Sequence, residues 1–443
     1  MKRALLFLIA TGLFSSLSAQ YTVSGGSGAP LQAVNNTQNR LEVYLLNGLS
    51  GAGIRFTSSN PGTHQWYRYR ENGNNAVPVS SVQEENSSYI TDIQDGYGYF
   101  VGSPTEVLPH YVWIIDYSKY VPRFFNLWAS EEEEDRCTDL KINADVEAEP
   151  LIYYFPSGAP GNLIRTYHLH YDTQVWSEEN RQFLPKEIDI EWSGLISERV
   201  IDAPLQNTYF TLTGDQFAGH FDNPQAIRSD EYRAIAVEAH GIAETSKEHA
   251  DNEMHHAGDA LGGSAPVEYT FTAYANEPVA ALYIWKILQQ DSITGEMTTI
   301  VRYTDKFLRY NFEREGIYRI ELEVDGQSVC PTCSVCVDTT QFFNLMIDNT
   351  VIKIPNAFSP GSSLGINDEL RIAFTSIVSF KASIYNSWGN LLFQWNDPAK
   401  GWDGRVNGKF VPTGVYYVIV EYKDSAGRNR TASKAVNVLR ARN

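Results

Sequence analysis

Short strand-like runs separated by turn residues recur along most of the chain, and they constrain its fold more than any other feature. Residues 41–46, 64–70 and 97–101 are rich in β-branched and aromatic side chains, with Asn, Gly or Pro between the runs. Residues 188–192 and 232–238 alternate apolar and polar side chains with a period of two, as half-buried strands do. Short strands at this spacing are typical of sandwiches. We therefore predict an all-β chain of tandem β-sandwiches.

Two stretches of the chain share a pattern of aromatic residues. Trp66 precedes the Asp-Gly-Tyr-Gly-Tyr sequence at residues 95–99 by about thirty positions, and Trp285 precedes Ile317-Tyr318 by a similar interval. A Trp on a central strand and a Gly/Tyr corner before a late strand are typical of immunoglobulin-like sandwiches. The first unit is therefore predicted to be Ig-like. The second also resembles the PKD-like domains of bacterial surface proteins.

The length of 443 residues corresponds to about three domains at ~150 residues each. Five acids at residues 131–135 indicate a solvated linker or face and suggest a boundary. We predict a signal peptide at 1–19, an Ig-like sandwich at 20–130, a β-rich and Ig-like domain at 136–265 that ends in a His-rich polar loop, a PKD/Ig-like domain with a Cys cluster at 266–350, and a seven-strand sandwich at 351–443.

The first nineteen residues have the pattern of a secretory signal peptide. Lys2 and Arg3 precede an apolar run, and small residues lead to Ala19, the expected cleavage point. The alternative, a membrane anchor, needs a longer apolar run of ~20 residues. No Cys follows the cleavage region, which disfavours a lipoprotein. We expect export to the periplasm, outer membrane or cell surface, with no transmembrane span after cleavage.

The net charge of −18 is unevenly distributed along the chain. From Val351 onward there are 12 Lys and Arg against 6 Asp and Glu, a net of +6; residues 4–350 carry a net of −26. An acidic chain of this kind lacks the basic surface of a nucleic-acid binder. The C-terminal segment is instead a basic module on an acidic body, and such asymmetry suggests separate partners.

Four cysteines are present, Cys137, Cys330, Cys333 and Cys336. The last three form a Cys-x-x-Cys-x-x-Cys run, which in a cytosolic protein would suggest a metal or redox site. Export to an oxidising compartment favours disulfides instead. We predict that Cys137 pairs with one of the three and that the other two pair locally.

Candidate catalytic and metal-binding patterns are weak. Residues 248–256 hold three His and three acidic residues without a His-Glu-x-x-His arrangement, so a polar loop is favoured over a zinc site. The sequence contains no phosphate-binding loop, nucleophile elbow or convincing carboxylate pair. We predict a chain that is not an enzyme and uses no cofactor or metal.

The last ninety residues contain seven expected strands, at 352–356, 369–374, 380–386, 391–395, near Trp402, 415–422 and 431–439. Asn-Gly and Ser-Ala-Gly sequences provide turns between them. The segment also carries spaced motifs in a fixed order: Pro-Asn-Ala-Phe-Ser-Pro from Pro355, Gly-Ile-Asn-Asp from Gly365, Tyr-Asn-Ser-Trp-Gly from Tyr385, Gly-Trp-Asp-Gly from Gly401 and Pro-Thr-Gly-Val-Tyr-Tyr from Pro412.

These motifs resemble the gliding motility-associated C-terminal domain family of Bacteroidetes, the type B sorting domain of the type IX secretion system. The matching positions that the resemblance marks as binding residues are Asn356, Phe358, Pro360, Asn367, Asp368, Asn386, Trp388, Gly389, Trp402, Asp403, Gly404, Gly414, Tyr416 and Arg440. The family usually has an Asp-containing turn where this chain has residues 361–365, which disfavours a calcium role for that loop.

The resemblance implies recognition by the outer-membrane translocon of type IX secretion or by its shuttle protein. The multi-sandwich architecture also resembles PorA-like components of that system, which implies a periplasmic signalling protein as a further partner. We expect a non-enzymatic secretion-associated protein that docks through its C-terminal domain. The alternative is a surface adhesin or binding protein carried as ordinary cargo.

Overall fold

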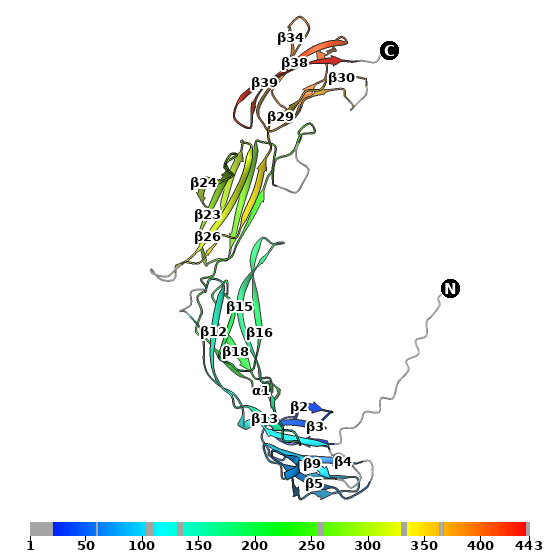
Figure 1. The fold of residues 1–443 in the computed structure, drawn as a ribbon, viewed down its shortest axis with the longest axis vertical. Coiled ribbons are helices and arrows are strands. Elements are labelled where there is room, and N and C mark those ends of the chain that lie inside the picture. Colours follow the sequence, from blue (N-terminus) through cyan, green and yellow to red (C-terminus); the bar gives the residue numbers. More distant parts are fainter. Residues whose placement is uncertain are drawn as a thin grey trace, which may run out of the picture.

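The computed structural model describes residues 21–58, 61–102, 110–130, 136–254, 261–328, 335–362, 365 and 367–439. Elements in these ranges are strands, apart from two three-residue 3-10 helices and one short α-helix, α1 (Gln216–His220). The strands form four sandwiches that follow one another along an elongated molecule (Figure 1). This arrangement confirms the predicted all-β fold. No helix within the described ranges is long and apolar enough to cross a membrane.

The first sandwich packs a four-stranded sheet on a six-stranded sheet. The four-stranded sheet has the spatial order β1 (Tyr21–Ser24), β4 (Gly53–Thr57), β8 (Ser87–Ile90), β7 (Val82–Gln83). The six-stranded sheet has the order β2 (Leu31–Asn36), β3 (Leu41–Leu46), β10 (Tyr111–Asp116), β9 (Tyr97–Gly102), β5 (Gln65–Tyr69), β6 (Val77–Val79). Trp66 and Tyr99, from the two stretches expected to mark an Ig-like core, are fully buried between the sheets. The Trp66 indole donates to Ser88 at 2.7 Å and the Tyr99 hydroxyl accepts the Gln94 N–H at 2.7 Å, so neither ring buries an unpaired polar atom.

The outer face of the six-stranded sheet is also buried, because the second domain packs on it. Its apolar residues, including Val43 and Trp113, share one core with β13 (Leu151–Tyr154), β14 (Pro160–Leu163) and α1. Beside this core, the buried Asp215 carboxylate pairs with Arg165 and accepts the hydroxyl hydrogen of Tyr117. The first two domains are therefore joined by a shared apolar core and a buried ion pair.

The second sandwich starts earlier than predicted. One sheet has the order β11 (Arg123–Ala129), β12 (Asp139–Glu147), β17 (Glu198–Asp202). The other has the order β16 (Gln182–Ser193), β15 (Thr166–Ser177), β18 (Thr211–Gly214), β19 (Gln225–Arg228). The predicted first domain, 20–130, includes β11, but β11 pairs with β12, so the boundary lies before Arg123. The acidic run at 131–135, which we predict to mark the boundary, lies outside the described residues.

The third sandwich also starts earlier than predicted. One sheet has the order β20 (Ala239–Glu244), β22 (Val267–Ala275), β25 (Phe307–Phe312). The other has the order β21 (Leu261–Gly263), β28 (Phe342–Ile347), β26 (Gly316–Gly326), β23 (Ala280–Gln290), β24 (Met297–Thr304), and β27 (Val337–Asp338) also pairs with β26. Trp285 is fully buried, and the Tyr318 hydroxyl donates to Arg314 O at 2.9 Å. Because β20 pairs with β22, the domain begins near Ala239 instead of 266. The His-rich stretch therefore follows the first strand of this domain in the sequence.

A disulfide joins Cys137 to Cys336 across a Cα–Cα distance of 5.4 Å. It links the second sandwich to the third, since Cys137 precedes β12 and Cys336 precedes β27. The prediction that Cys137 pairs with one of the three clustered cysteines is confirmed. Cys330 and Cys333 lie outside the described residues, so their local pairing stays a prediction.

The C-terminal domain contains the predicted strands in the predicted order. A five-stranded sheet, β30 (Ala357–Phe358), β39 (Asn429–Val438), β38 (Gly414–Asp424), β33 (Ile377–Tyr385), β34 (Leu391–Trp395), is completed by the pairs β29 (Val351–Lys353) with β32 (Ala373–Thr375), β31 (Leu370–Arg371) with β35 (Gly401–Trp402), and β36 (Arg405–Val406) with β37 (Lys409–Phe410). Its core centres on Trp402, Val418 and Val436, which are fully buried.

Candidate functional site

Most motif residues of the C-terminal domain hold its fold together. Asn356 and Phe358 flank or form β30, and their carbonyls accept the N–H groups of Asn437 and Leu439 at 2.9 Å each. The Phe358 ring is buried, with its centroid 5.5 Å from that of Trp402. These motif positions therefore fasten β30, near the start of the domain, to β39, its last strand.

The Gly-Trp-Asp-Gly motif forms a tight turn against Pro360. The Trp402 indole donates to Arg405 O at 3.0 Å, and Asp403 Oδ1 accepts the Arg405 N–H at 3.0 Å. Gly404 has φ +76°, and a Cβ there would lie 2.7 Å from the Pro360 ring. Only glycine meets both conditions, which explains the motif without a ligand.

Tyr416 and the loop before it have a similar structural role. The Tyr416 hydroxyl donates to Pro412 O at 2.9 Å, and its ring stacks edge-on against Trp402 at 5.8 Å. Gly414 begins β38. Arg440 lies outside the described residues.

Asn367 and Asp368 close the loop that follows β30. Asn367 O accepts the Ser359 N–H at 2.7 Å, and Asp368 Oδ2 accepts the Gly365 N–H at 3.0 Å. The Asp368 carboxylate is thus used within its own turn. Among the described residues no group of three or more His, Cys, Asp and Glu side chains is placed to hold a metal ion.

Trp388 differs from the other motif residues. Asn386 Oδ1 accepts the N–H groups of Trp388 at 3.0 Å and Asn390 at 2.9 Å, and Gly389 adopts φ +80°. The backbone of this turn is therefore well fixed. The Trp388 indole, however, is 85% exposed, so its side chain has no packing role that would explain it.

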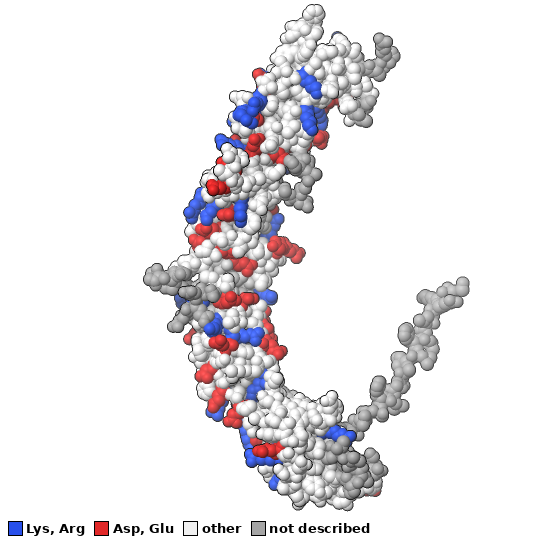
Figure 2. Space-filling model, in the orientation of Figure 1, with Lys and Arg blue, Asp and Glu red and all other residues white. Residues whose placement is uncertain are grey.

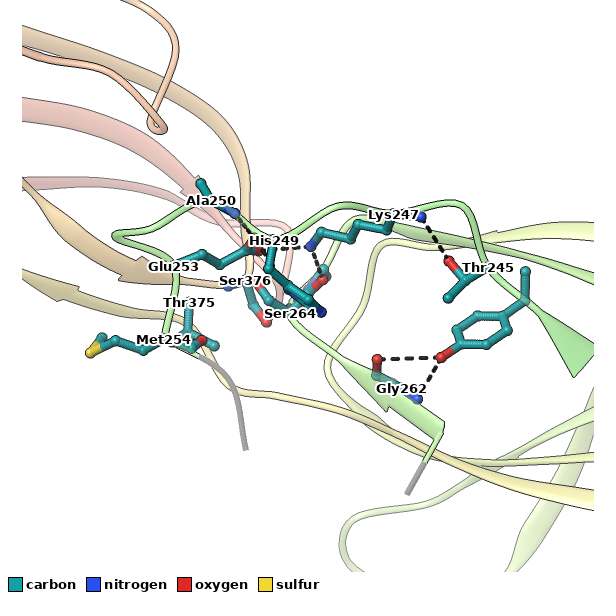
Figure 3. Close-up of polar contacts among 12 residues, drawn as sticks. Thr245, Lys247, His249, Ala250, Glu253, Met254, Gly262, Ser264, Thr375 and Ser376 are labelled. Atoms are coloured by element: carbon teal, nitrogen blue, oxygen red, sulfur yellow. Dashed lines mark hydrogen bonds and ion pairs between the residues drawn. The ribbon is translucent and has the colours of Figure 1, made fainter. Parts of the chain in front are cut away.

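The His-rich stretch binds the C-terminal domain to the third sandwich. Residues 245–254, which we call the strap, leave β20 and run along β32 (Figure 3). Phe374 N–H donates to Asn252 O at 3.1 Å and Met254 N–H donates to Phe374 O at 2.7 Å. The Asn252 side-chain amide donates to Ile372 O and Pro398 O, both at 2.8 Å. The strap is thus an added edge of the C-terminal domain.

The strap is fixed at its other end to the third sandwich. Lys247 Nζ lies 2.7 Å from Glu253 Oε1 and 2.5 Å from Ser264 O. Burial acts to raise the pKa of the Glu253 carboxyl, but hydrogen bonds from Lys247 and Ser264 and the Lys247 charge outweigh it and hold that pKa below its ordinary value. Residues 245–254 form the predicted polar loop, but Asn252 and Glu253 attach it to its neighbours, which the sequence does not predict. His255 and His256 lie outside the described residues.

A second set of hydrogen bonds joins the same two domains without any strap residue. Ser376 N–H donates to Ser264 Oγ at 2.7 Å, and Ala265 N–H donates to Ser376 Oγ at 3.0 Å. Nearby, Ser425 Oγ donates to Glu315 Oε2 and its N–H to Thr350 Oγ1, both at 2.7 Å. Ser264, Ser376 and Ser425 are fully buried, so these contacts belong to an interior and not to a loose linker.

Sequence reasoning missed these joint residues. Isolated serines, a threonine and an asparagine between strands show no periodicity or motif, and the partners lie about 110 residues apart in the sequence. Beside the joint lies a cleft of about 700 Å³, lined by Met254, Ile317, Met346, Lys353 and other residues. Its lining offers no paired carboxylates or nucleophile with a base.

Two segments of the chain match known protein families. Residues 352–436 match the family described as CHU_C type IX secretion signal domain, and residues 129–229 match a fibronectin type III domain. The chain therefore carries a type IX secretion signal domain, which ties it to that secretion system and indicates export to the cell surface or outer membrane. The resemblance to PorA-like components is not tested by these matches and stays a prediction. No curated protein matches the chain significantly.

Solved structures that resemble the chain are tandem-domain proteins. The N-terminal eight Ig domains of Down syndrome cell adhesion molecule match at 9% identity and TM-score 0.21, covering 94% of this chain and 56% of that one. Sidekick-1 immunoglobulin domains 1–5 match at 11% identity and TM-score 0.23, covering 86% and 74%. Three N-terminal domains of the Hoc protein of bacteriophage RB49 match at 9% identity and TM-score 0.20, covering 72% of this chain and 100% of that one. TM-scores this low carry no argument about this chain.

Proposed function

We propose that this protein is a non-enzymatic protein of the outer membrane or cell surface that docks on the type IX secretion machinery through a C-terminal domain it retains. The observation that carries the proposal is the joint between the third and fourth domains. A signal that is to be removed needs only a linker, whereas here the strap and the buried serines integrate the domain into the body. The partners are the outer-membrane translocon or its shuttle protein, with a role as component or signalling partner.

The mass of the surface-exposed form tests retention of the domain. Intact-protein mass spectrometry of the chain released from washed cells is expected to show a C-terminus at Asn443. A second measurement, affinity purification from detergent-solubilised envelopes, is expected to recover translocon proteins with the full chain. A form that ends before Val351 would contradict the proposal.

The second candidate function is ordinary cargo, an adhesin or binding protein. The secretion signal domain itself favours it, since such a domain also serves to deliver a body that acts elsewhere. Under this alternative the surface form lacks the C-terminal domain, and cells that produce the chain without it retain the body inside the envelope. The same mass measurement therefore separates the two functions.

A further inference from the structure

The outer face of the five-stranded sheet in the C-terminal domain is unusually apolar at one end. Along β38, Tyr416, Val418 and Val420 point into the core, so Val415, Tyr417 and Ile419 lie on the opposite face. A sheet with one face on the core is expected to be polar on the other. Here Val415 and Tyr417 are 46% and 47% exposed, and the described residues paired with them, Asn437, Ala435 and Tyr385, are uncharged.

Strand register extends this surface across the sheet. Tyr417 lies opposite Tyr385 on β33, and Tyr385 lies opposite Leu391 on β34. Leu391 is 52% exposed. Trp388 occupies the turn that joins β33 to β34. We call these residues the pole patch: Tyr385, Trp388, Leu391, Val415 and Tyr417.

The charged residues of the same face lie at the opposite end of the sheet. Lys381 pairs with Glu421 at 3.3 Å, and Lys423 follows in the next outward row. This end is fixed by Ser425, which contacts Glu315 of the third domain. Ten residues of strand separate Ser425 from Val415, or roughly 30 Å. The pole patch therefore lies at the free end of the molecule, and in Figure 2 that end is almost without charged side chains on the face in view.

We infer that the pole patch is the surface through which this domain enters an uncharged, apolar slot on a protein of the type IX secretion machinery, with Trp388 as the anchor. The inference rests on the proposed function. Trp and Tyr dominate the binding energy of protein interfaces, and the fixed Asn386 turn presents the indole at little cost in entropy. The five residues of the pole patch are uncharged and so favour an uncharged partner surface. Lys381 and Lys423 favour acidic residues of the partner on the side facing the third domain.

A membrane surface and a second copy are the other possible occupants. Binding to an anionic membrane needs basic residues around the apolar contact, and the basic residues that the structure describes on this face, Lys381 and Lys423, lie at its other end. The end-on position also leaves the body about 30 Å away, so a bulky receptor could reach the patch. We therefore favour the protein slot and leave the other occupants to the test.

Photo-crosslinking in living cells tests the occupant. A type IX-secreting bacterium produces the full chain with benzoylphenylalanine at Leu391, or at Leu195 as control; Leu195 is 86% exposed on the second sandwich. We expect adducts with a translocon or shuttle protein from position 391 only. Adducts with a second copy of the chain, with lipid, or at equal yield from position 195 would overturn the inference.

Affinity purification of variants separates this inference from the proposed function. The double variant Trp388→Ser/Tyr417→Ser is expected to recover at least tenfold less translocon than the wild type, with an unchanged melting temperature because both side chains are exposed. Phe125→Ser, 57% exposed in the second sandwich, is the control and should change nothing. Equal recovery by the wild type and the double variant would overturn the pole patch alone, whereas no recovery by the wild type would overturn the proposed function.

Discussion

Asp215 is 1% exposed, which is the lowest value among the charged residues that the structure describes as buried. Its carboxylate is buried between Arg165, Tyr117 and the Ala218 N–H, which it accepts at 3.0 Å. Burial, followed by the hydrogen bond to Asp215, raises the pKa of the Tyr117 phenol, so this group stays protonated and donates. The Arg165 guanidinium donates in addition to the carbonyls of Tyr120 and Glu149 at 2.7 and 2.8 Å.

Removing this carboxylate should loosen the joint between the first two domains. Asp215→Ala leaves Arg165 buried without its counter-charge, a change that costs about 3–5 kcal/mol. Denaturant unfolding monitored by Trp fluorescence should show the loss. Asp230→Ala, an exposed carboxylate of the same domain, is the control and should stay within ~0.5 kcal/mol; a similar small effect at Asp215 would contradict the assignment.

At the scale of elements, the strap should behave as part of the C-terminal domain. Asn252→Ala removes two part-buried hydrogen bonds, to Ile372 O and Pro398 O. Each is worth about 1 kcal/mol, and more where an acceptor is left unpaired. We expect faster hydrogen exchange in β32 and a lower melting temperature of the C-terminal domain. The matched control is Asp251→Ala, because its ion pair with Arg371 at 3.1 Å is exposed and worth at most ~1 kcal/mol.

Glu253 makes the strap sensitive to acid. Since the folded pKa lies below the ordinary value, the ionised carboxylate stabilises the fold above its unfolded pKa of ~4.3. That stabilisation is lost as the pH falls through the folded pKa. Wild type should therefore melt above Glu253→Gln at pH 7, and the difference should vanish in acid. A difference that grows on acidification would mean that the sign is wrong.

Sequence patterns predicted the sandwiches and seven strand positions in the C-terminal domain because period-two burial and turn residues are local properties. The short strands β30, β36 and β37, and the division of the strand expected at 369–374 into β31 and β32, were not predicted. Trp66, Trp285 and Trp402 were informative for the same reason, since each large ring marks a core. The boundaries at 130 and 265 were wrong because β11 and β20 could pair on either side of a polar stretch. Trp388 was read as one motif residue among many, and only its exposure distinguishes it from Trp402.

At the scale of the whole molecule, each joint between successive domains is fastened in a different way. The first uses a shared apolar core, the second the Cys137–Cys336 disulfide, and the third the strap. The second joint is reinforced where Trp176, at the end of the long β15–β16 hairpin, stacks on His240 at 4.5 Å. The basic C-terminal module is thereby held at one end of an acidic rod (Figure 1).

Loss of the disulfide should affect the second joint more than the others. The bridge closes a loop of 199 residues, and disulfides typically contribute ~2–4 kcal/mol. Cys137→Ser/Cys336→Ser should therefore unfold the second and third sandwiches at a lower denaturant concentration. Limited proteolysis should cut first near this joint, and unchanged cleavage between the second and third domains would contradict the prediction. Adding reductant to the wild type should reproduce the effect, whereas the double serine variant should respond less.

The strap also has a consequence for the order of events during export. Its residues follow β20 of the third sandwich in the sequence, yet they supply an edge to a domain that begins about a hundred residues later in the chain. The C-terminal domain therefore attains its full set of contacts only after the domain before it has folded. A receptor that binds the C-terminal domain only when the strap is docked on it would therefore select chains whose third domain has already folded.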